Sequence, residues 1–88
     1  MGKMENEEFY EEFGYTRYRD WEVYWGVAVV VKNEREKKVY ILKDPSFPVT
    51  AEEEAEWYRK QGYSVEIILP GEELPHDIPE PLRKVLDP

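Results

Sequence analysis

Apart from carboxylates, few side chains in this sequence could perform acid–base or nucleophilic chemistry. His76 is the single histidine among 88 residues, and it lies in the proline-bracketed stretch PHDIP beside Asp77. A serine hydrolase needs a hydroxyl, a histidine base and a carboxylate held together, but Ser46 and Ser64 have no histidine near them in the sequence. We therefore interpret His76 as a surface residue and Asp77 as a helix cap, and we expect no enzymatic activity.

Carboxylates are abundant, but their spacing predicts no metal or cofactor site. Glu52, Glu53, Glu54 and Glu56 cluster in a stretch of helix-forming residues, where a solvated helix face accounts for them. The calcium-loop pattern of alternating acids before a glycine is absent. The five glycines stand singly, and there is no cysteine. A phosphate-binding glycine loop, a disulfide and a thiolate metal site are thus not expected.

Binding chemistry is the remaining possibility, and it concentrates in the segment YTRYRDWEVYWG. These twelve residues hold five aromatic side chains and two arginines. Such residues are enriched at protein interfaces, they also stack on the bases of single-stranded nucleic acid, and they are simply good strand formers. All three interpretations stay open. The candidate interaction surface consists of Tyr15, Arg17, Tyr18, Arg19, Trp21 and Tyr24.

Charge divides the chain into a basic and an acidic part. The formal net charge is −8, yet residues 15–43 carry a net charge of +3 and the remainder carries −11. A net negative charge repels nucleic acid unless the basic patch dominates locally. We therefore expect a protein partner or a second copy of the chain, and single-stranded nucleic acid is the alternative partner.

The composition places the chain in a broad class. At 88 residues it is one domain. The longest apolar run, residues 27–31, is far shorter than the roughly 20 residues of a membrane-spanning helix. The lack of cysteine favours a reducing compartment, the cytoplasm. A charged fraction of 36% is typical of proteins from hot environments.

Local patterns predict the elements that position these residues. Phe9 and Phe13 are spaced as on one helix face, which predicts a short helix over residues 7–13 after a frayed start at 1–8. A period of two over residues 15–31 predicts one long strand, with a break near Asp20 or Gly26. Thr50 and Glu53 form a capping box before a helix that ends at Gly62. Further strands are expected at 38–44 and 63–69, and a short helix at 78–86 within the proline-rich tail 71–88.

These elements predict a small α+β domain with a three-stranded antiparallel sheet and ββαβ topology. The most apolar strand should be central, so the expected strand order is second, first, third. The main helix, through Ala51, Ala55 and Tyr58, covers one face of this sheet. The other face needs either the terminal helical segments or a second copy of the chain. We also expect Trp21 or Trp25, but not both, to anchor the core.

Overall fold

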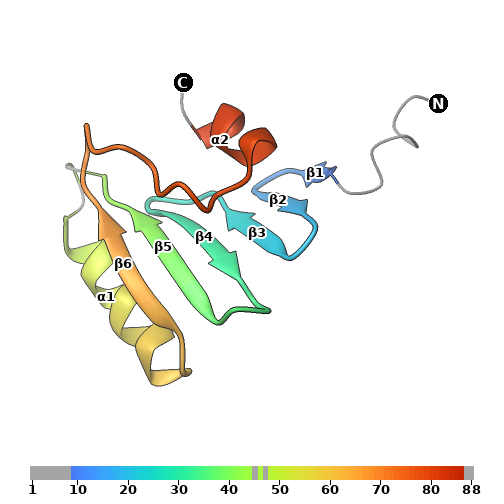
Figure 1. The fold of residues 1–88 in the computed structure, drawn as a ribbon. Helices are drawn as coiled ribbons and strands as arrows, with labels where there is room; N and C mark the ends of the chain where they lie inside the picture. Colours follow the sequence, from blue (N-terminus) through green and yellow to red (C-terminus); the bar gives the residue numbers. More distant parts are fainter. Residues whose placement is uncertain (1–8, 45, 47, 87–88) are drawn as a thin grey trace.

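The computed structural model describes residues 9–44, 46 and 48–86, which form a six-stranded mixed sheet with two helices (Figure 1). Strands β1 to β5 form an antiparallel meander, and β6 pairs with β5 in parallel. In chain order, the elements are β1 (Phe9–Glu12), β2 (Tyr15–Tyr18), β3 (Trp21–Tyr24), β4 (Val29–Asn33), β5 (Lys38–Leu42), α1 (Pro48–Lys60), β6 (Ser64–Ile68) and α2 (Glu80–Leu86).

The expected three-stranded sheet is wrong in both strand number and order. The sheet order is β1-β2-β3-β4-β5-β6, so the strand predicted at 38–44 is internal and β6 forms an edge. The antiparallel placement predicted for β6 is also wrong, because α1 carries the chain back across the sheet and lets β6 run parallel to β5.

The segment predicted as the first helix forms strand β1 in its described part. Phe9 lies opposite Tyr18, and Glu12 lies opposite Tyr15. A helix would have stacked like charges four residues apart, whereas a strand places Glu11 and Glu12 on opposite faces. Residues 7 and 8 of the predicted helix lie outside the described residues.

The predicted long strand is interrupted at both expected places. A two-residue turn at Arg19 and Asp20 separates β2 from β3, and Arg19 adopts a left-handed φ of 56° there. Residues 25–28, which include Gly26, separate β3 from β4. The prediction of a break is therefore confirmed, but each break reverses the chain, so the segment forms three strands.

Helix α1 covers one face of β5 and β6, which we call face B. Ala51 and Ala55 are fully buried, and they pack with Val30, Val39 and Ile41 of the sheet, as predicted for this helix face. The helix begins at Pro48, so the predicted cap at Thr50 is wrong. Proline suits the first turn because its missing N–H has no partner there in any helix.

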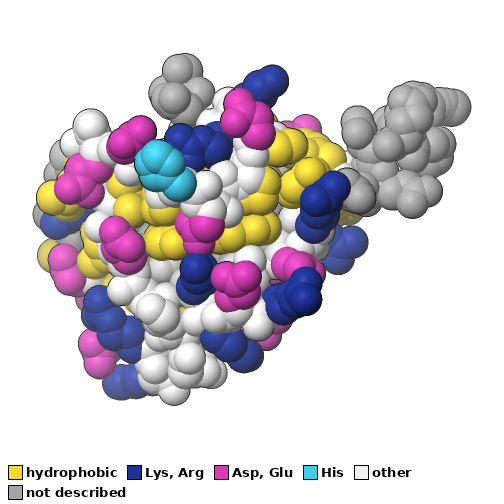
Figure 2. Space-filling view, viewed as in Figure 1, with side chains coloured by type: hydrophobic (Ala, Val, Ile, Leu, Met, Phe, Trp, Pro, Cys, Tyr) yellow, Lys and Arg dark blue, Asp and Glu magenta, His cyan; other side chains and the backbone are white. Residues whose placement is uncertain are grey.

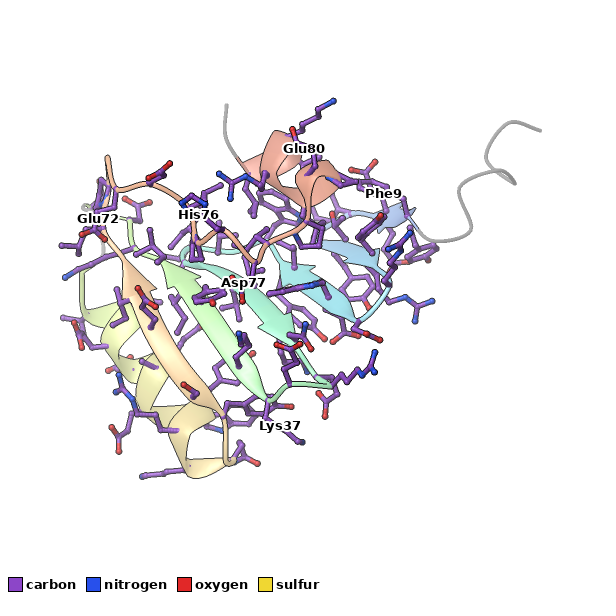
Figure 3. All side chains as sticks on the ribbon, viewed as in Figure 1. Phe9, Lys37, Glu72, His76, Asp77 and Glu80 are labelled. Carbon is purple, nitrogen blue, oxygen red and sulfur yellow. The ribbon has the colours of Figure 1, made fainter. Side chains whose placement is uncertain are left out.

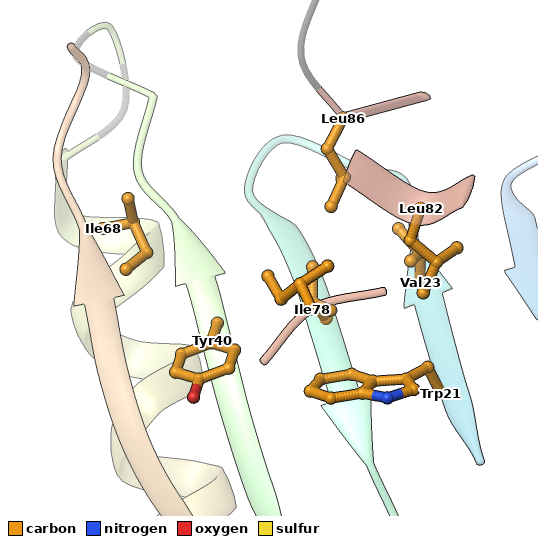
Figure 4. Close-up of a cluster of buried hydrophobic side chains, with 8 residues drawn as sticks. Trp21, Val23, Tyr40, Ile68, Ile78, Leu82 and Leu86 are labelled. Atoms are coloured by element: carbon orange, nitrogen blue, oxygen red, sulfur yellow. The ribbon is translucent and has the colours of Figure 1, made fainter. Parts of the chain in front are cut away.

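The opposite face of the sheet, face A, is covered by α2 and the segment before it. Ile78, Leu82 and Leu86 are buried against Trp21 and Val23 (Figure 4). The terminal helix and its covering role are thus confirmed. Phe13, which the predicted helix over residues 7–13 would have placed beside Phe9 in this cover, is instead fully exposed. Figure 2, which views this side, shows hydrophobic side chains in a band beneath the charged residues of the surface.

Asp77 does not act as the predicted helix cap. It points from the segment before α2 toward the sheet (Figure 3). Its carboxylate accepts hydrogen bonds from Lys38 Nζ at 2.8 Å and from the Tyr40 hydroxyl at 2.9 Å. These bonds fasten the covering segment to β5, so a residue read as a local cap makes a long-range contact instead.

Candidate functional site

Three tyrosine rings lie side by side on the part of face B that α1 does not reach. Tyr10, Tyr15 and Tyr24 come from β1, β2 and β3, and successive ring centroids are 6.2 and 5.3 Å apart. Tyr10 is 45% exposed and Tyr24 is 37% exposed. We call this surface the open tyrosine face; it consists of Tyr10, Glu12, Tyr15, Arg17, Glu22, Tyr24 and Lys32.

The hairpin register explains why these side chains meet. Tyr15 lies opposite Tyr24, and Arg17 lies opposite both Glu22 and Tyr10. Directly paired residues point to the same face of a sheet. In a continuous strand, Tyr15 and Tyr24 would have pointed to opposite faces, and the turn after Tyr18 brings them together.

The structure divides the six predicted interaction residues among three places. Tyr15, Arg17 and Tyr24 share the open tyrosine face. Trp21 is buried in the core on face A, where Tyr18 also packs. Arg19 lies in the turn, with its guanidinium 5.1 Å from the centroid of the Tyr18 ring.

The two tryptophans differ as expected from the sequence. Trp21 is 7% exposed, whereas Trp25 is 38% exposed. The indole Nε1 of Trp25 donates a hydrogen bond of 2.9 Å to Thr16 Oγ1. The prediction that only one of the two anchors the core is confirmed by this difference in burial.

Glu22 joins two of the tyrosines at the centre of the face. Its carboxylate accepts hydrogen bonds from the Tyr15 hydroxyl at 2.8 Å and from the Tyr24 hydroxyl at 3.0 Å. Burial raises the pKa of Glu22, but these two bonds and Lys32 lower the pKa by more, so the carboxylate stays charged. Burial and the bond to Glu22 in turn raise the pKa of Tyr15 to about 12. The face therefore presents neutral phenol rings held in fixed positions.

Lys32 connects the open tyrosine face to the region beneath α1. Its Nζ lies 3.3 Å from Glu22 and 5.6 Å from the centroid of the Tyr24 ring. Burial alone would lower the pKa of Lys32, but Tyr24 and Glu22 raise this pKa by a larger amount. The pKa is therefore raised, and the ammonium group stays protonated. The charge of Lys32 thus offsets the charge of Glu22 within the face.

A groove of about 370 Å³ borders the face where the sheet meets α1. Tyr24 and Lys32 line it from the sheet, and Trp57 and Tyr58 line it from the helix. The rings of Trp57 and Tyr58 are perpendicular, with centroids 5.0 Å apart. Since Trp57 is 58% exposed, the groove adds an accessible aromatic side chain to the three tyrosines.

Sequence reasoning missed Tyr10, Glu22, Lys32 and Trp57 as members or neighbours of this surface. The spacing of Phe9 and Phe13 predicts a helix that includes Tyr10. Aromatic residues such as Phe9 and Tyr10 are also common in strands, and Tyr10 lies in β1. Glu22 and Lys32 carried no local signal, because their roles depend on pairing between strands. Trp57 lies next to Tyr58 of the buried helix face, and its side chain is 58% exposed.

The single histidine lies apart from the open tyrosine face, in the segment before α2. The side chain of His76 is 85% exposed, and its Nε2 lies 3.9 Å from Glu73 (Figure 3). Among the described residues there is no group of three or more His, Cys, Asp or Glu side chains that could hold a metal ion. In the same part of the chain, neither helix has the length and apolar character required to span a membrane.

The open tyrosine face thus combines accessible aromatic rings with pairs of opposite charges. Comparison with models of protein families, with curated proteins and with solved structures found no match for this chain.

Proposed function

We propose that this chain is a non-enzymatic interaction module that binds a protein partner through the open tyrosine face. The observation that carries the proposal is the position of α1, which packs against β5 and β6 and leaves the rings on β1 to β3 exposed. Tyrosine supplies a large contact area with few rotatable bonds, and it is enriched where proteins bind one another.

The charges of the face support a protein rather than a nucleic acid. Glu12 and Glu22 balance Arg17 and Lys32, so the face itself has no net positive charge. The whole chain carries −8. Single-stranded nucleic acid needs a basic groove beside the stacking rings, and this face lacks such an excess.

The partner proposed here has a basic surface. The acidic net charge of the chain would attract it over a distance and accelerate association. Glu53 and Glu54, which border a hollow beside Trp57 and Tyr58, supply negative charge next to the aromatic surface. We place this interaction in the cytoplasm, on the argument from the cysteine-free composition.

Affinity capture from an extract of the source cells tests the proposal. The informative variant combines Tyr10→Ser with Tyr24→Ser, since both side chains are exposed and their loss should leave the core intact. The matched control is Leu69→Ser, which removes another exposed apolar side chain outside the face. A partner should be retained by the wild type and by the control but lost by the double variant. Equal retention by all three would contradict the proposal.

Titration with labelled single-stranded RNA and DNA at two salt concentrations tests the alternative. We expect no binding at either concentration. Binding that weakens steeply with salt, and that disappears in the Arg17→Ala, Arg19→Ala variant, would identify a nucleic-acid platform instead.

A further inference from the structure

The outer edge of β6 carries backbone groups that are free to pair with another strand. Ser64 N–H donates to the Lys37 carbonyl at 2.9 Å, and Lys43 N–H donates to the Ile68 carbonyl at 3.0 Å. Because hydrogen-bonding direction alternates along a strand, Ser64, Glu66 and Ile68 bond to β5. The N–H and C=O groups of Val65 and Ile67 therefore point away from the sheet. Figure 1 shows β6 at the margin of the sheet, and no described strand lies beyond it.

This edge has little of the protection that sheet edges usually carry. Glu66 is the single charged residue within β6, and Val65 and Ile67 are half-buried. The opposite edge, β1, presents the exposed acids Glu11 and Glu12. Charged residues, prolines and bulges normally prevent edge strands from pairing with other chains, so β6 is the edge more open to pairing.

The neighbouring flank of α1 has a charge pattern that complements itself. Tyr58 and Gln61 face the groove beside Tyr24, so the other flank of the helix faces the β6 edge. Helical spacing places Glu52, Glu56 and Arg59 on that second flank, where Glu52 also lies 3.9 Å from Lys43 Nζ of the same chain. It is acidic along the first part of α1 and basic near its end, where Lys60 follows. Two such helices lying antiparallel would set acid against base.

We propose that a second copy of this chain pairs with β6 in antiparallel orientation, about a two-fold axis at Val65. This arrangement extends the sheet continuously from one copy into the other and brings the two α1 helices together on face B. A two-fold axis uses the same surface of both copies. The proposal concerns the edge opposite β1 and is independent of the open tyrosine face.

The charge of Glu66 selects the register. With the axis at Glu66, two carboxylates would lie directly opposite each other, which is destabilising. With the axis at Val65, Glu66 lies opposite Ser64 of the second copy. Each Val65 N–H then donates a hydrogen bond to the Val65 carbonyl of the other copy. Ile67 N–H donates to the Tyr63 carbonyl of the second copy. Tyr63 N–H stays on the Tyr58 carbonyl, to which it already donates at 3.1 Å.

Val65→Pro tests the pairing, although it also removes a side chain that packs against the core beneath α1. Proline removes the N–H of Val65, which points outward, and so leaves the hydrogen bonds between β5 and β6 in place. Sedimentation from micromolar to millimolar protein should show a dimer for the wild type. In the variant the dissociation constant should rise at least about tenfold, because two intermolecular hydrogen bonds are lost. A wild type that stays monomeric, or a variant that dimerises equally well, overturns the proposal.

A charge exchange provides a second test if Val65→Pro weakens the fold. Arg59→Glu should weaken the dimer, because it sets acid against acid across the helix pair. Adding Glu52→Arg to that variant should restore the dimer. Because Glu52 Oε2 also lies 3.9 Å from Lys43 Nζ of the same chain, Glu52→Arg alone is the control for the loss of that contact. Failure of the double variant to recover would contradict the helix arrangement.

Disulfide trapping reports the register directly, since the chain has no cysteine of its own. In the proposed pairing the Cα atoms of the two Val65 residues lie about 5.5 Å apart, which is within the range of a disulfide. Val65→Cys should therefore form a covalent dimer on mild oxidation. Glu66→Cys is the matched control, because in this register its two copies lie about 8 Å apart. Cross-linking of Glu66→Cys but not of Val65→Cys would overturn the proposed axis.

Discussion

Replacing Trp21 with alanine would remove the largest side chain of the core on face A. The indole is 7% exposed, and it stacks on the Tyr40 ring with centroids 6.2 Å apart and an interplanar angle of 14°. Truncation of a buried tryptophan costs about 3–5 kcal/mol. The lost ring contact adds to that cost, so we expect a value in the upper half of the range. The total stability of such a domain is about 5–15 kcal/mol, so this cost is a large fraction of it.

Trp25→Ala is the matched comparison, because it makes the same change four residues away. This side chain is 38% exposed, and its specific contact is the hydrogen bond to Thr16 Oγ1. Loss of that bond and of partial burial should cost about 1–2 kcal/mol. The two variants thus differ in the free energy of unfolding by about 2–4 kcal/mol, although both lie in the same aromatic segment.

Urea denaturation followed by circular dichroism would measure both free energies of unfolding. An equal slope of the free energy of unfolding against urea concentration would show that the folded and unfolded states are equally compact in each variant. The melting temperature of Trp21→Ala should fall by at least about 16 °C, given a shift of roughly 4–8 °C per kcal/mol for a domain of this size. Equal costs for the two variants would refute the placement of β3, and with it the division of the aromatic residues between faces A and B.

Three further changes test other contacts. Glu22→Gln should lower the pKa of Tyr15 from about 12 toward its ordinary value in an ultraviolet absorbance titration; the raised pKa also means that wild-type stability declines as the pH rises from the ordinary tyrosine value through about 12. Asp77 has a lowered pKa, because hydrogen bonds from Lys38 and Tyr40 outweigh the opposing effect of burial, so its contribution to stability is lost as the pH falls through that pKa. Asp77→Asn should flatten this acid limb in melts at a series of pH values. Leu82→Ala, at a fully buried site, should cost about 2–5 kcal/mol in urea denaturation and increase the binding of an apolar dye.

The elements with strong local signals could be predicted from the sequence. Gly62 ends α1 with a φ of 97°, which an L side chain rarely adopts, and the small residues Ala51 and Ala55 marked the buried helix face. Strand β6 and helix α2 also form close to their predicted positions. In each case a few neighbouring residues determine the outcome.

Features that depend on pairing between distant segments could not be predicted in this way. The turn at Arg19 and Asp20 has no glycine or asparagine, so its residue types do not predict a left-handed backbone. Pairing of the two strands of the hairpin stabilises the left-handed conformation of Arg19. The parallel pairing of β6 with β5 likewise depends on the path of α1. The candidate site could therefore be predicted only in part. The sequence identifies Tyr15 and Tyr24, but the single long strand that it predicts would have placed them on opposite faces, whereas they are paired.

The cover of face A has a consequence for biosynthesis. Ile78, Leu82 and Leu86 follow all six strands in the sequence, so the sheet leaves the ribosome before the segment that covers it. During that interval, Trp21, Val23 and Val31 form an apolar surface in contact with water, of the kind that chaperones bind and that promotes aggregation. A lag between emergence of the sheet and docking of α2 would thus set how long each nascent chain needs such protection.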